Sequence, residues 1–362
     1  LRLTTCWLVS IDKPCGGVRP VAVGEVFLKV ASTLSVNAGM DSLHSFFGDV
    51  QFGIGRPRGA EEIVHRCRAF TRAPDAPKKC VVCLDFRNAF NVPLREEIWT
   101  VAKHFPLLRG IFALEYARPS ELVFRPTKGI IRSTRGTRQG STAGAVFFCL
   151  AMQPVLESVR SVHGVTVLAY MDDVTLLAPT PSIAELAVAT IVDQAARIGI
   201  ELNSSKCEFM SRVEPSGPLT KSFRRVAAVK LLGASVAFDD DAEKTRLAQF
   251  DHVTAFRKFF DRISCVRGPQ ALALLSACAA PKLDHVLRTH SVDVSGDLAK
   301  DFDKVMFACM AKLADVDDTE YARLLAHLPA REGGLGVTSS VSKAPHAYRA
   351  STAAVHLGSE AP

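Results

Sequence analysis

Three aspartates interrupt apolar, β-prone stretches of this sequence. Asp172 and Asp173 lie inside LAYMDDVTLLA (168–178), and Asp85 lies near the end of CVVCLDF (80–86). Removing an ionised carboxylate from water costs several kcal/mol. Two unit charges about 4 Å apart also repel by roughly 4 kcal/mol at an effective dielectric near 20. Adjacent carboxylates in such a setting therefore need a positive partner.

Hard oxygen ligands without His or Cys beside them suit Mg²⁺. If the strand that ends at Asp85 and the hairpin tip at 172–173 are neighbours in one sheet, the three carboxylates converge at its edge. Two ions about 3.5 to 4 Å apart would then offset the repulsion, activate an attacking hydroxyl and stabilise a leaving phosphate. The residues themselves predict phosphoryl or nucleotidyl transfer and nothing narrower.

The elements around these carboxylates follow from periodicity. CVVCLDF predicts a buried strand, and residues 165–178 predict two short strands joined by a turn at Met171 and Asp172. Long apolar helices are predicted over 141–159 and 181–200, with an Arg-rich hairpin at 120–136. This order favours an α+β domain with an antiparallel sheet backed by helices. From Asp241 onward the pattern is helical, so we expect a linker at 238–240.

Composition narrows the classes of protein. Of 362 residues, 48% are hydrophobic and 22% charged, and Lys plus Arg exceed Asp plus Glu by 44 − 37 = 7, which suits a polyanionic partner without requiring one. Ten scattered cysteines without framework spacing predict reduced thiols in an intracellular protein. No apolar run approaches the roughly 20 residues of a membrane span, so we expect no membrane partner. The chain starts at Leu1 without a Met and is expected to be a fragment.

Five segments together carry a family resemblance. In order and spacing they resemble the palm motifs of reverse transcriptases: LDFRNAF (84–90), RQGSTAG (138–144), YMDD (170–173), GIELNSSKCEFM (199–210) and KLLGASV (230–236). Upstream, residues 13–30 and 51–65 are similar to finger segments of non-LTR retrotransposon reverse transcriptases. Downstream, residues 328–340 and 344–351 are similar to site-specific elements that insert into spliced-leader or ribosomal RNA genes. The resemblance spans nearly the whole chain.

The resemblance implies a right-hand polymerase fold with fingers, an antiparallel-sheet palm and a helical thumb. The implied domains are fingers at 1–82, palm at 83–238 with 106–136 contributing to the fingers, thumb at 239–328, and a C-terminal extension at 329–362. No endonuclease signature, zinc knuckle or DNA-binding array is recognisable in the sequence.

The resemblance also implies roles for individual residues. Asp85, Asp172 and Asp173 would be catalytic and hold two Mg²⁺ ions, with Mn²⁺ as an alternative, and the carbonyl of Phe86 would add a ligand. Lys206 would donate a proton to the leaving pyrophosphate. Phe90 would exclude a 2′-hydroxyl. Nucleotide contacts would come from Lys13, Arg19, Asn88, Ala89, Arg138, Gln139 and Gly140. Primer and template contacts would come from Tyr170, Met171, Leu232 and Gly233.

The implied activity is RNA-directed DNA synthesis in retrotransposition, with an RNA template, a DNA primer and dNTPs as partners and the nucleus as the location. One alternative is an inactive polymerase-like scaffold that binds RNA, against which the intact aspartates and Lys206 count. Another is an RNA-dependent RNA polymerase, against which Phe90 counts. The sequence indicates neither the target locus nor the oligomeric state.

Overall fold

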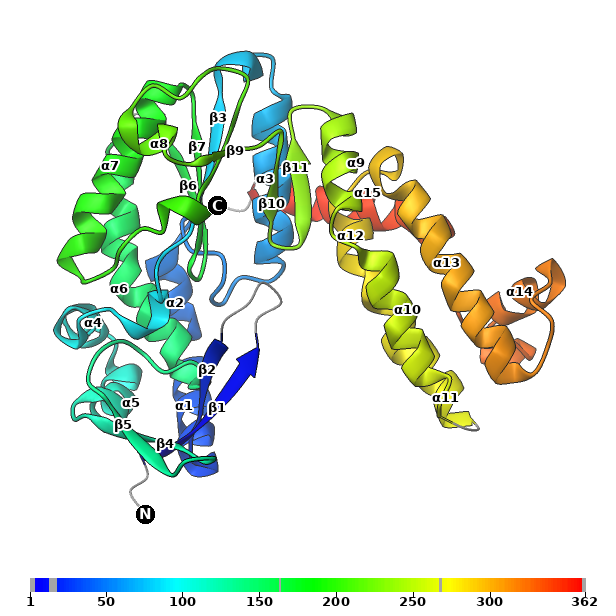
Figure 1. Ribbon diagram of the computed structural model, residues 1–362, viewed down its shortest axis with the longest axis horizontal. Coiled ribbons are helices and arrows are strands. Elements are labelled where there is room, and N and C mark those ends of the chain that lie inside the picture. Colours follow the sequence, from blue (N-terminus) through cyan, green and yellow to red (C-terminus); the bar gives the residue numbers. More distant parts are fainter. Residues whose placement is uncertain (1–3, 13–17, 163, 267–268, 360–362) are drawn as a thin grey trace. The chain divides into compact units, whose positions relative to one another are not determined.

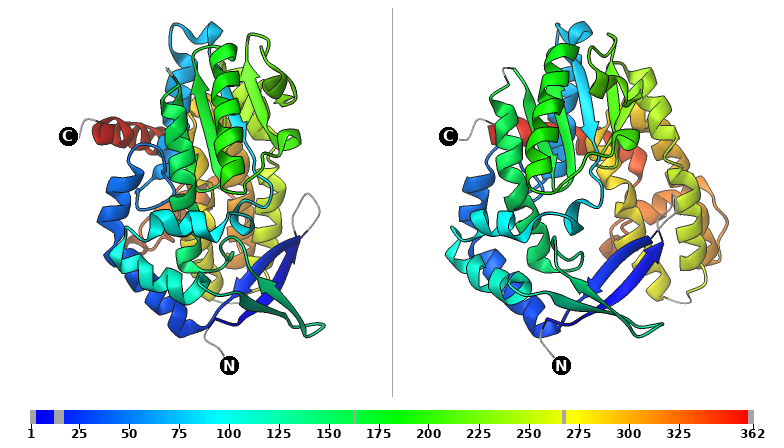
Figure 2. Two further views of the ribbon diagram at one scale, coloured as in Figure 1. Left: turned by 90° about the vertical axis from the view of Figure 1, so that its left-hand side faces the viewer. Right: turned by 60° about the vertical axis from the view of Figure 1, so that its left-hand side comes forward.

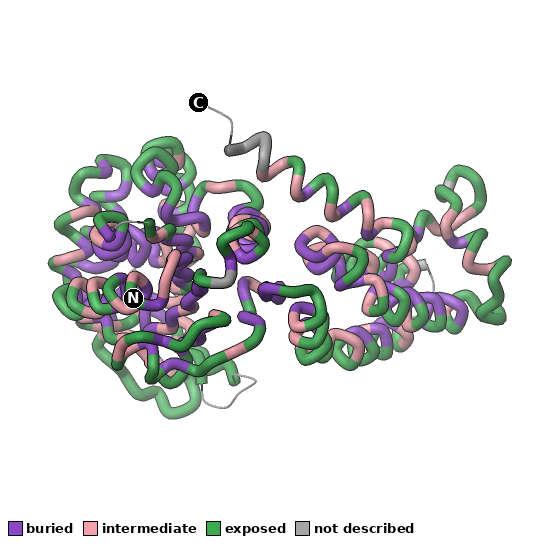
Figure 3. Tube along the Cα trace, turned by 90° about the horizontal axis from the view of Figure 1, so that it is seen from above, coloured by how far each residue is buried: buried purple, intermediate pink, exposed green. Residues whose placement is uncertain are grey.

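The computed structural model describes residues 4–12, 18–162, 164–266 and 269–359. The chain forms two compact units. Unit 1 comprises residues 1–60 and 77–226, and unit 2 comprises residues 61–76 and 227–362. Buried positions gather within each unit (Figure 3).

A five-stranded sheet forms the centre of unit 1, in the order β6-β7-β3-β8-β9. All neighbouring strands are antiparallel except β8 and β9. The strand bounds are β3 (Cys80–Leu84), β6 (Thr166–Tyr170), β7 (Asp173–Ala178), β8 (Glu208–Ser211) and β9 (Arg224–Arg225). The predicted antiparallel sheet is therefore confirmed.

Two long helices pack on this sheet, as Figures 1 and 2 show. Helix α6 (Thr142–Arg160) contacts β6, and α7 (Pro181–Arg197) contacts β7 and β3. Each is preceded by an N-cap residue whose hydroxyl oxygen accepts a backbone N–H, Ser141 for α6 and Thr180 for α7. By length and composition α6 could cross a membrane, contrary to our expectation of no such run, but 72% of its apolar window is buried. That burial makes it a core helix.

A second sheet in unit 1 has the order β2-β1-β4-β5. Its strands are β1 (Cys6–Asp12), β2 (Val18–Val23), β4 (Ser120–Phe124) and β5 (Gly129–Ser133). β1 pairs antiparallel with β2 and parallel with β4. The remaining helices are α1 (Val26–Ala38), α2 (Met40–Phe47), α4 (Arg95–Ala102), α5 (Pro106–Tyr116), α8 (Pro218–Lys221), and the 3₁₀ turns η1 (Ala76–Lys78), η2 (Ala89–Asn91) and η3 (Ser204–Lys206).

Unit 2 combines a hairpin with helices around a core that includes Phe256, Phe260 and Phe302. The hairpin is β10 (Ala228–Leu231) with β11 (Ala234–Ala237). The helices are α3 (Gly59–Arg72), α9 (Asp240–Ala248), α10 (His252–Ile263), α11 (Pro269–Leu274), α12 (Asp284–Thr289), α13 (Val292–Ala314), α14 (Glu320–His327) and α15 (Ser340–Ser359). Shorter turns are η4 (Leu275–Ala279), η5 (Ala280–Leu283) and η6 (Ala330–Glu332).

The predicted α+β class is confirmed, but two segments group differently from the expected domains. The hairpin at 228–237, expected in the palm, belongs to unit 2, where β11 contacts α9. Most of α3, expected in the fingers, also belongs to unit 2, where Arg68 forms a buried ion pair with Glu243 of α9. Within the expected linker at 238–240, Asp239 caps α9 and Asp240 is its first residue.

Candidate active site

Asp85 and Asp173 meet at one edge of the five-stranded sheet. Leu84, the last residue of β3, pairs with Val174 of β7. Asp85 and Asp173 are each one residue beyond that pair, on strands that lie about 4.8 Å apart. The predicted strand neighbourhood is therefore confirmed, and it brings carboxylates from segments almost ninety residues apart in sequence to the same edge.

Asp172 lies in the two-residue turn between β6 and β7, where Tyr170 pairs with Asp173. The pKa of Asp172 is raised, first by desolvation and then by the charge of Asp85, although its own backbone N–H and the charge of Arg19 oppose this. The pKa of Asp173 is raised to about 6 by desolvation, Asp172 and Asp85, even though part of that residue is exposed. The charges of Asp85 and Asp172 thus act on a neighbouring carboxylate in a partly dehydrated place.

Asp85, Asp172 and Asp173 offer only carboxylate oxygens, the type of ligand atom that Mg²⁺ prefers. In the part of the chain that the structure describes, no three His, Cys, Asp or Glu side chains already form a metal-binding group. A bound cation would therefore have to draw the carboxylates of Asp85, Asp172 and Asp173 together.

Arg19 is the described cation that acts on Asp172 electrostatically. It is exposed on β2, opposite Ile11 of β1. The hairpin predicted around it is confirmed by the β1–β2 pairing. Lys13, predicted on the other arm, lies outside the described residues.

The loop that precedes β8 supports Asp85. The backbone N–H of Asn203 donates to the Asp85 carbonyl oxygen at 2.8 Å, and the side-chain amide of Asn203 donates to Asp85 Oδ1 at 2.9 Å. The Asp85 N–H points to Cys207 Sγ at 3.4 Å. Lys206, in the same loop, is exposed. Its proposed proton transfer stays a prediction.

The segment after Asp85 pairs with the residues that precede β8, since the Arg87 N–H donates to the Glu201 carbonyl oxygen. Phe86 is buried and bridges to Leu202, and its carbonyl stays a predicted ligand. Asn88 is exposed in the left-handed region (φ 49°), and Ala89 is buried. The partly buried ring of Phe90 packs on Phe148 with centroids 4.5 Å apart, which limits its movement.

Gln139 and Gly140 lie against the β2 strand, just before α6. The Ala22 N–H donates to the Gln139 carbonyl oxygen at 2.7 Å. Gly140 has φ 103°, and a Cβ there would come within 2.5 Å of the Ala22 carbonyl oxygen, so glycine is required. Gln139 Oε1 is buried without a hydrogen-bond partner among the described residues. A buried acceptor of this kind needs a donor, and the predicted nucleotide contact of Gln139 stays a prediction.

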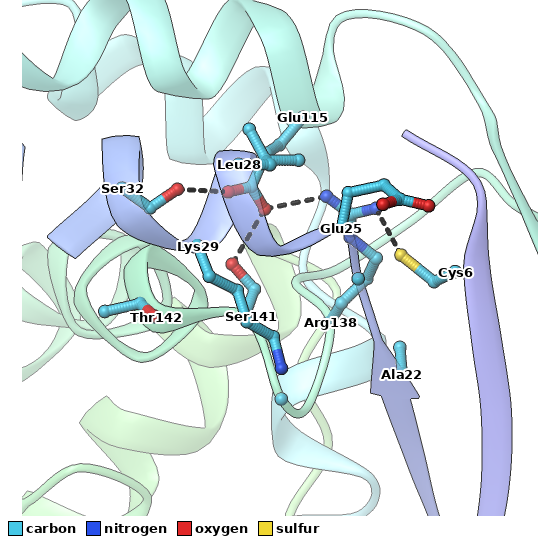
Figure 4. A pocket seen from close by; sticks show the side chains of 12 residues that line it. Cys6, Ala22, Glu25, Leu28, Lys29, Ser32, Glu115, Arg138, Ser141 and Thr142 are labelled. Atoms are coloured by element: carbon cyan, nitrogen blue, oxygen red, sulfur yellow. Dashed lines mark hydrogen bonds and ion pairs between the residues drawn. The ribbon is translucent and has the colours of Figure 1, made fainter. Parts of the chain in front are cut away.

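Arg138 lies in a buried ion pair with Glu115. The sequence predicted a nucleotide contact, but its side chain is only 3% exposed and donates to Glu115 Oε2 at 2.7 Å. Further bonds reach Cys6 Sγ and the Thr4 carbonyl oxygen. Figure 4 shows Glu115 between Arg138, Ser141 and Ser32. Arg138 therefore neutralises a buried carboxylate and anchors the start of α6, because an unpaired charge there would be costly.

The remaining predicted residues lie in or beside two hairpin turns. Tyr170 ends β6, and Met171 follows it with φ 56°. Leu232 and Gly233 form the β10–β11 turn of unit 2, with φ 50° and 85°. His285 Nε2 lies 2.8 Å from the Leu232 carbonyl oxygen. The primer contact predicted for the second turn stays a prediction.

Sequence reasoning missed three residues that support the site: Gln51, Asn203 and Glu115. Gln51 and Asn203 fall inside segments that carry the family resemblance, QFGIG and ELNSS, yet neither residue type is itself a catalytic signal. Glu115 lies in an ordinary helical pattern. Its partners are 83 and 23 residues away, so no local signal marks it.

Comparisons with known proteins give the family. The pattern of the family described as "Reverse transcriptase (RNA-dependent DNA polymerase)" matches residues 11–236. This chain belongs to that family. It is also 26% identical over 356 residues to the "Retrotransposable element SLACS 132 kDa protein" of Trypanosoma brucei gambiense, covering 96% of this chain. The chain spans 29% of the length of that relative.

Solved structures show the fold. Telomerase of Candida albicans, in complex with a fragment of telomeric RNA, matches with a TM-score of 0.54 and 12% identity, covering 99% of this chain and 62% of that one. Apo telomerase of Candida tropicalis matches with a TM-score of 0.51 and 10% identity, covering 98% and 64%. The chain therefore has the right-hand polymerase fold that the sequence predicted.

Proposed function

We propose that this chain catalyses RNA-templated DNA synthesis, extending a primer 3′-hydroxyl with dNTPs. The observation that supports this best is the pairing of β3 with β7, which sets Asp85 beside Asp173 and next to the turn that holds Asp172. Three mutually repelling carboxylates at an otherwise apolar sheet edge suit a reaction on phosphate, and family membership narrows that reaction to nucleotidyl transfer.

Asp85 and Asp172 would hold two Mg²⁺ ions, or Mn²⁺ in their place, with Asp173 and the Phe86 carbonyl completing the set. When bound, such ions activate a hydroxyl for attack and neutralise charge on a leaving phosphate. The raised pKa values of Asp172 and Asp173 support this assignment, because a bound cation would remove the repulsion that raises them.

The reaction forms a bond between the primer 3′-oxygen and the α-phosphorus, and it breaks the bond between the α-phosphorus and the bridging oxygen to the β-phosphate. The proton of the 3′-hydroxyl passes to water. Lys206 would give a proton to the departing pyrophosphate. Arg19, with Lys13, would bind the triphosphate. Arginine suits this role because its guanidinium can donate two parallel hydrogen bonds to a phosphate.

Selectivity would come from residues around the nucleotide. Phe90 would occupy the space that a 2′-hydroxyl needs, and its packing on Phe148 supports a fixed position. The open acceptor of Gln139, the Gly140 backbone, and residues 88–89 would contact nucleotide or template. Tyr170, Met171, Leu232 and Gly233 would contact the primer end and the duplex.

The biological setting that we propose is retrotransposition with a DNA primer in the nucleus. The support is the similarity to a retrotransposable-element protein, of which this chain spans a minority. The basic excess of seven charges suits an RNA template and a DNA primer, because phosphate contacts supply much of the affinity for nucleic acids.

Primer extension on an RNA template tests the proposal. The chain should incorporate dNTPs only when Mg²⁺ or Mn²⁺ is present, and Asp172→Asn should lower incorporation at least a thousandfold. Asp193→Asn is a matched control, since Asp193 lies in an exposed ion pair with Arg197. Preference for rNTPs would indicate an RNA polymerase instead. A folded chain that binds RNA but incorporates nothing would leave only the scaffold.

A further inference from the structure

The turn between β6 and β7 has an unusual backbone. Met171 has φ 56°, in the left-handed region that side chains with a Cβ rarely adopt. The next residue is Asp172, so the conformation of Met171 sets where that carboxylate starts. A backbone of this kind persists only when its surroundings hold it.

A single buried side chain holds Met171 from both sides. The Met171 N–H donates to Gln51 Oε1 at 2.7 Å, and Gln51 Nε2 donates to the Met171 carbonyl oxygen at 3.3 Å. Gln51 is only 1% exposed and lies 120 residues away in sequence. One amide therefore satisfies the donor and the acceptor of the residue with the strained backbone.

The orientation of the Gln51 amide is determined by its partners. Oε1 also accepts the Gly53 N–H at 3.0 Å, so both of its partners are donors. A flipped amide would set its NH₂ against two N–H groups. Gly53 packs closely against Met171: a Cβ at position 53 would lie 2.9 Å from the Met171 nitrogen.

The backbone around Gln51 is fastened to the sheet that carries the aspartates. Gln51 bridges to Ala169 in parallel, the Phe52 N–H donates to the Ala169 carbonyl oxygen at 2.7 Å, and the Ala169 N–H donates to the Val50 carbonyl oxygen at 2.8 Å. β6 is the edge strand of that sheet. Residues 50–52 thus extend the sheet by a short segment.

We propose that Gln51 is a positioning residue for the catalytic turn. It keeps Met171 in the left-handed conformation and thereby holds Asp172 where it can act with Asp85. The expected effect on nucleotide incorporation rests on the proposed polymerase function. The structural part, control of the turn by Gln51, is independent of that function.

Hydrogen exchange tests the structural part without any activity. Gln51→Met keeps the volume and removes both amide contacts. The Met171 amide should then exchange at least tenfold faster, while amides in the centre of β7 should be unchanged. Gln194→Met is a control for the substitution type, since Gln194 is an amide of unit 1 whose side chain, among the described residues, bonds only to exposed Asp193. It should leave the Met171 amide protected.

Kinetics tests the consequence. Gln51→Met should lower kcat for nucleotide incorporation by ten- to a hundredfold, which is about 1.4 to 2.8 kcal/mol in activation free energy. KM for the dNTP should change less than threefold. In a Met171→Gly background, the fall in kcat caused by Gln51→Met should be at least threefold smaller, because glycine adopts a positive φ without strain.

The exchange and kinetic results separate control of the turn from the polymerase function. The proposal is overturned if Gln51→Met lowers kcat equally with and without Met171→Gly. It is also overturned if the exchange rate of the Met171 amide is unchanged in Gln51→Met. An inactive parent chain with faster Met171 exchange in the variant supports control of the turn and removes only the polymerase function. If Gln51→Met fails to fold, Gly53→Ala replaces it. The Cβ of this variant would crowd the Met171 nitrogen, so the Met171 amide should again exchange faster. An unchanged exchange rate would overturn the proposal.

Discussion

Asn203 holds Asp85 through two hydrogen bonds, one from its backbone N–H to the Asp85 carbonyl oxygen and one from its side-chain amide to Asp85 Oδ1. The two residues are 118 positions apart in sequence. Together with Gln51, which contacts the Met171 turn, Asn203 makes both acidic segments of the candidate site dependent on neutral amides.

Asn203→Ala should lower the rate of nucleotide incorporation. The substitution removes the side-chain bond and leaves the backbone bond. Hydrogen bonds to charged groups are worth about 1.5 to 3 kcal/mol, and partial exposure reduces this, so we expect a fall in kcat of roughly tenfold. Single-turnover incorporation is the measurement. Ser205→Ala, which removes only a contact to Asn203 Oδ1, is the control and should lose less than threefold.

Phe90→Ala should weaken sugar discrimination. Removing the ring would open space for a 2′-hydroxyl, so the ratio of kcat/KM for dNTP over rNTP should fall at least tenfold. Phe90→Tyr keeps the ring and should keep most of the discrimination. If ribonucleotide use does not rise in Phe90→Ala, the ring on Phe148 is only a core contact.

Breaking the buried pair of Arg138 and Glu115 should destabilise unit 1. Both side chains are at most 3% exposed. Glu115→Ala leaves an uncompensated buried guanidinium, so the free energy of unfolding should fall by about 3 to 5 kcal/mol. Denaturant unfolding followed by hydrogen exchange in α6 measures this. Asp193→Ala is the surface control, since its pair with Arg197 is exposed and should matter by less than about 1 kcal/mol.

Acid should destabilise unit 2 through His290. This side chain is fully buried, and its pKa is lowered to about 3 by desolvation and by the nearby charge of Arg68, while its bond to the Val286 carbonyl oxygen opposes the shift. Glu243 lies 4.0 Å from its Nε2, and His285 and His252 also act on it. The Ser235 N–H donates to Nε2, so the folded state needs the neutral ring.

The direction of the pH effect follows from linkage. The unfolded chain takes up the His290 proton near pH 6.5, and the folded chain does so only near pH 3. Stability from the neutral ring is therefore complete above about pH 6.5 and is lost progressively as the pH falls toward 3. Between pH 6.5 and 5 the loss should be about 2 kcal/mol. Hydrogen exchange in α12 across this range measures it, and in His290→Gln this contribution to the slope should disappear. An unchanged slope in the variant would contradict the assignment.

The sequence by itself determined the local elements and the acidic positions within them. Apolar β-prone residues at 80–84 predict the strand that ends before Asp85, and the two-residue turn at Met171 and Asp172 follows from the alternation around it. These features depend on neighbouring residues, so a local pattern contains them. The ordered motifs also indicated the reverse transcriptase family, and the family match over residues 11–236 confirmed it.

Only the tertiary structure decided which distant groups meet. It directed Arg138 to Glu115 instead of a nucleotide, joined α3 to unit 2 through Arg68 and Glu243, and set Gln51 against Met171. Each of these contacts links segments 23 to 175 residues apart. Whether a polar side chain faces a ligand or a buried partner depends on how helices and sheets pack, and neither residue type nor spacing along the chain encodes that packing locally.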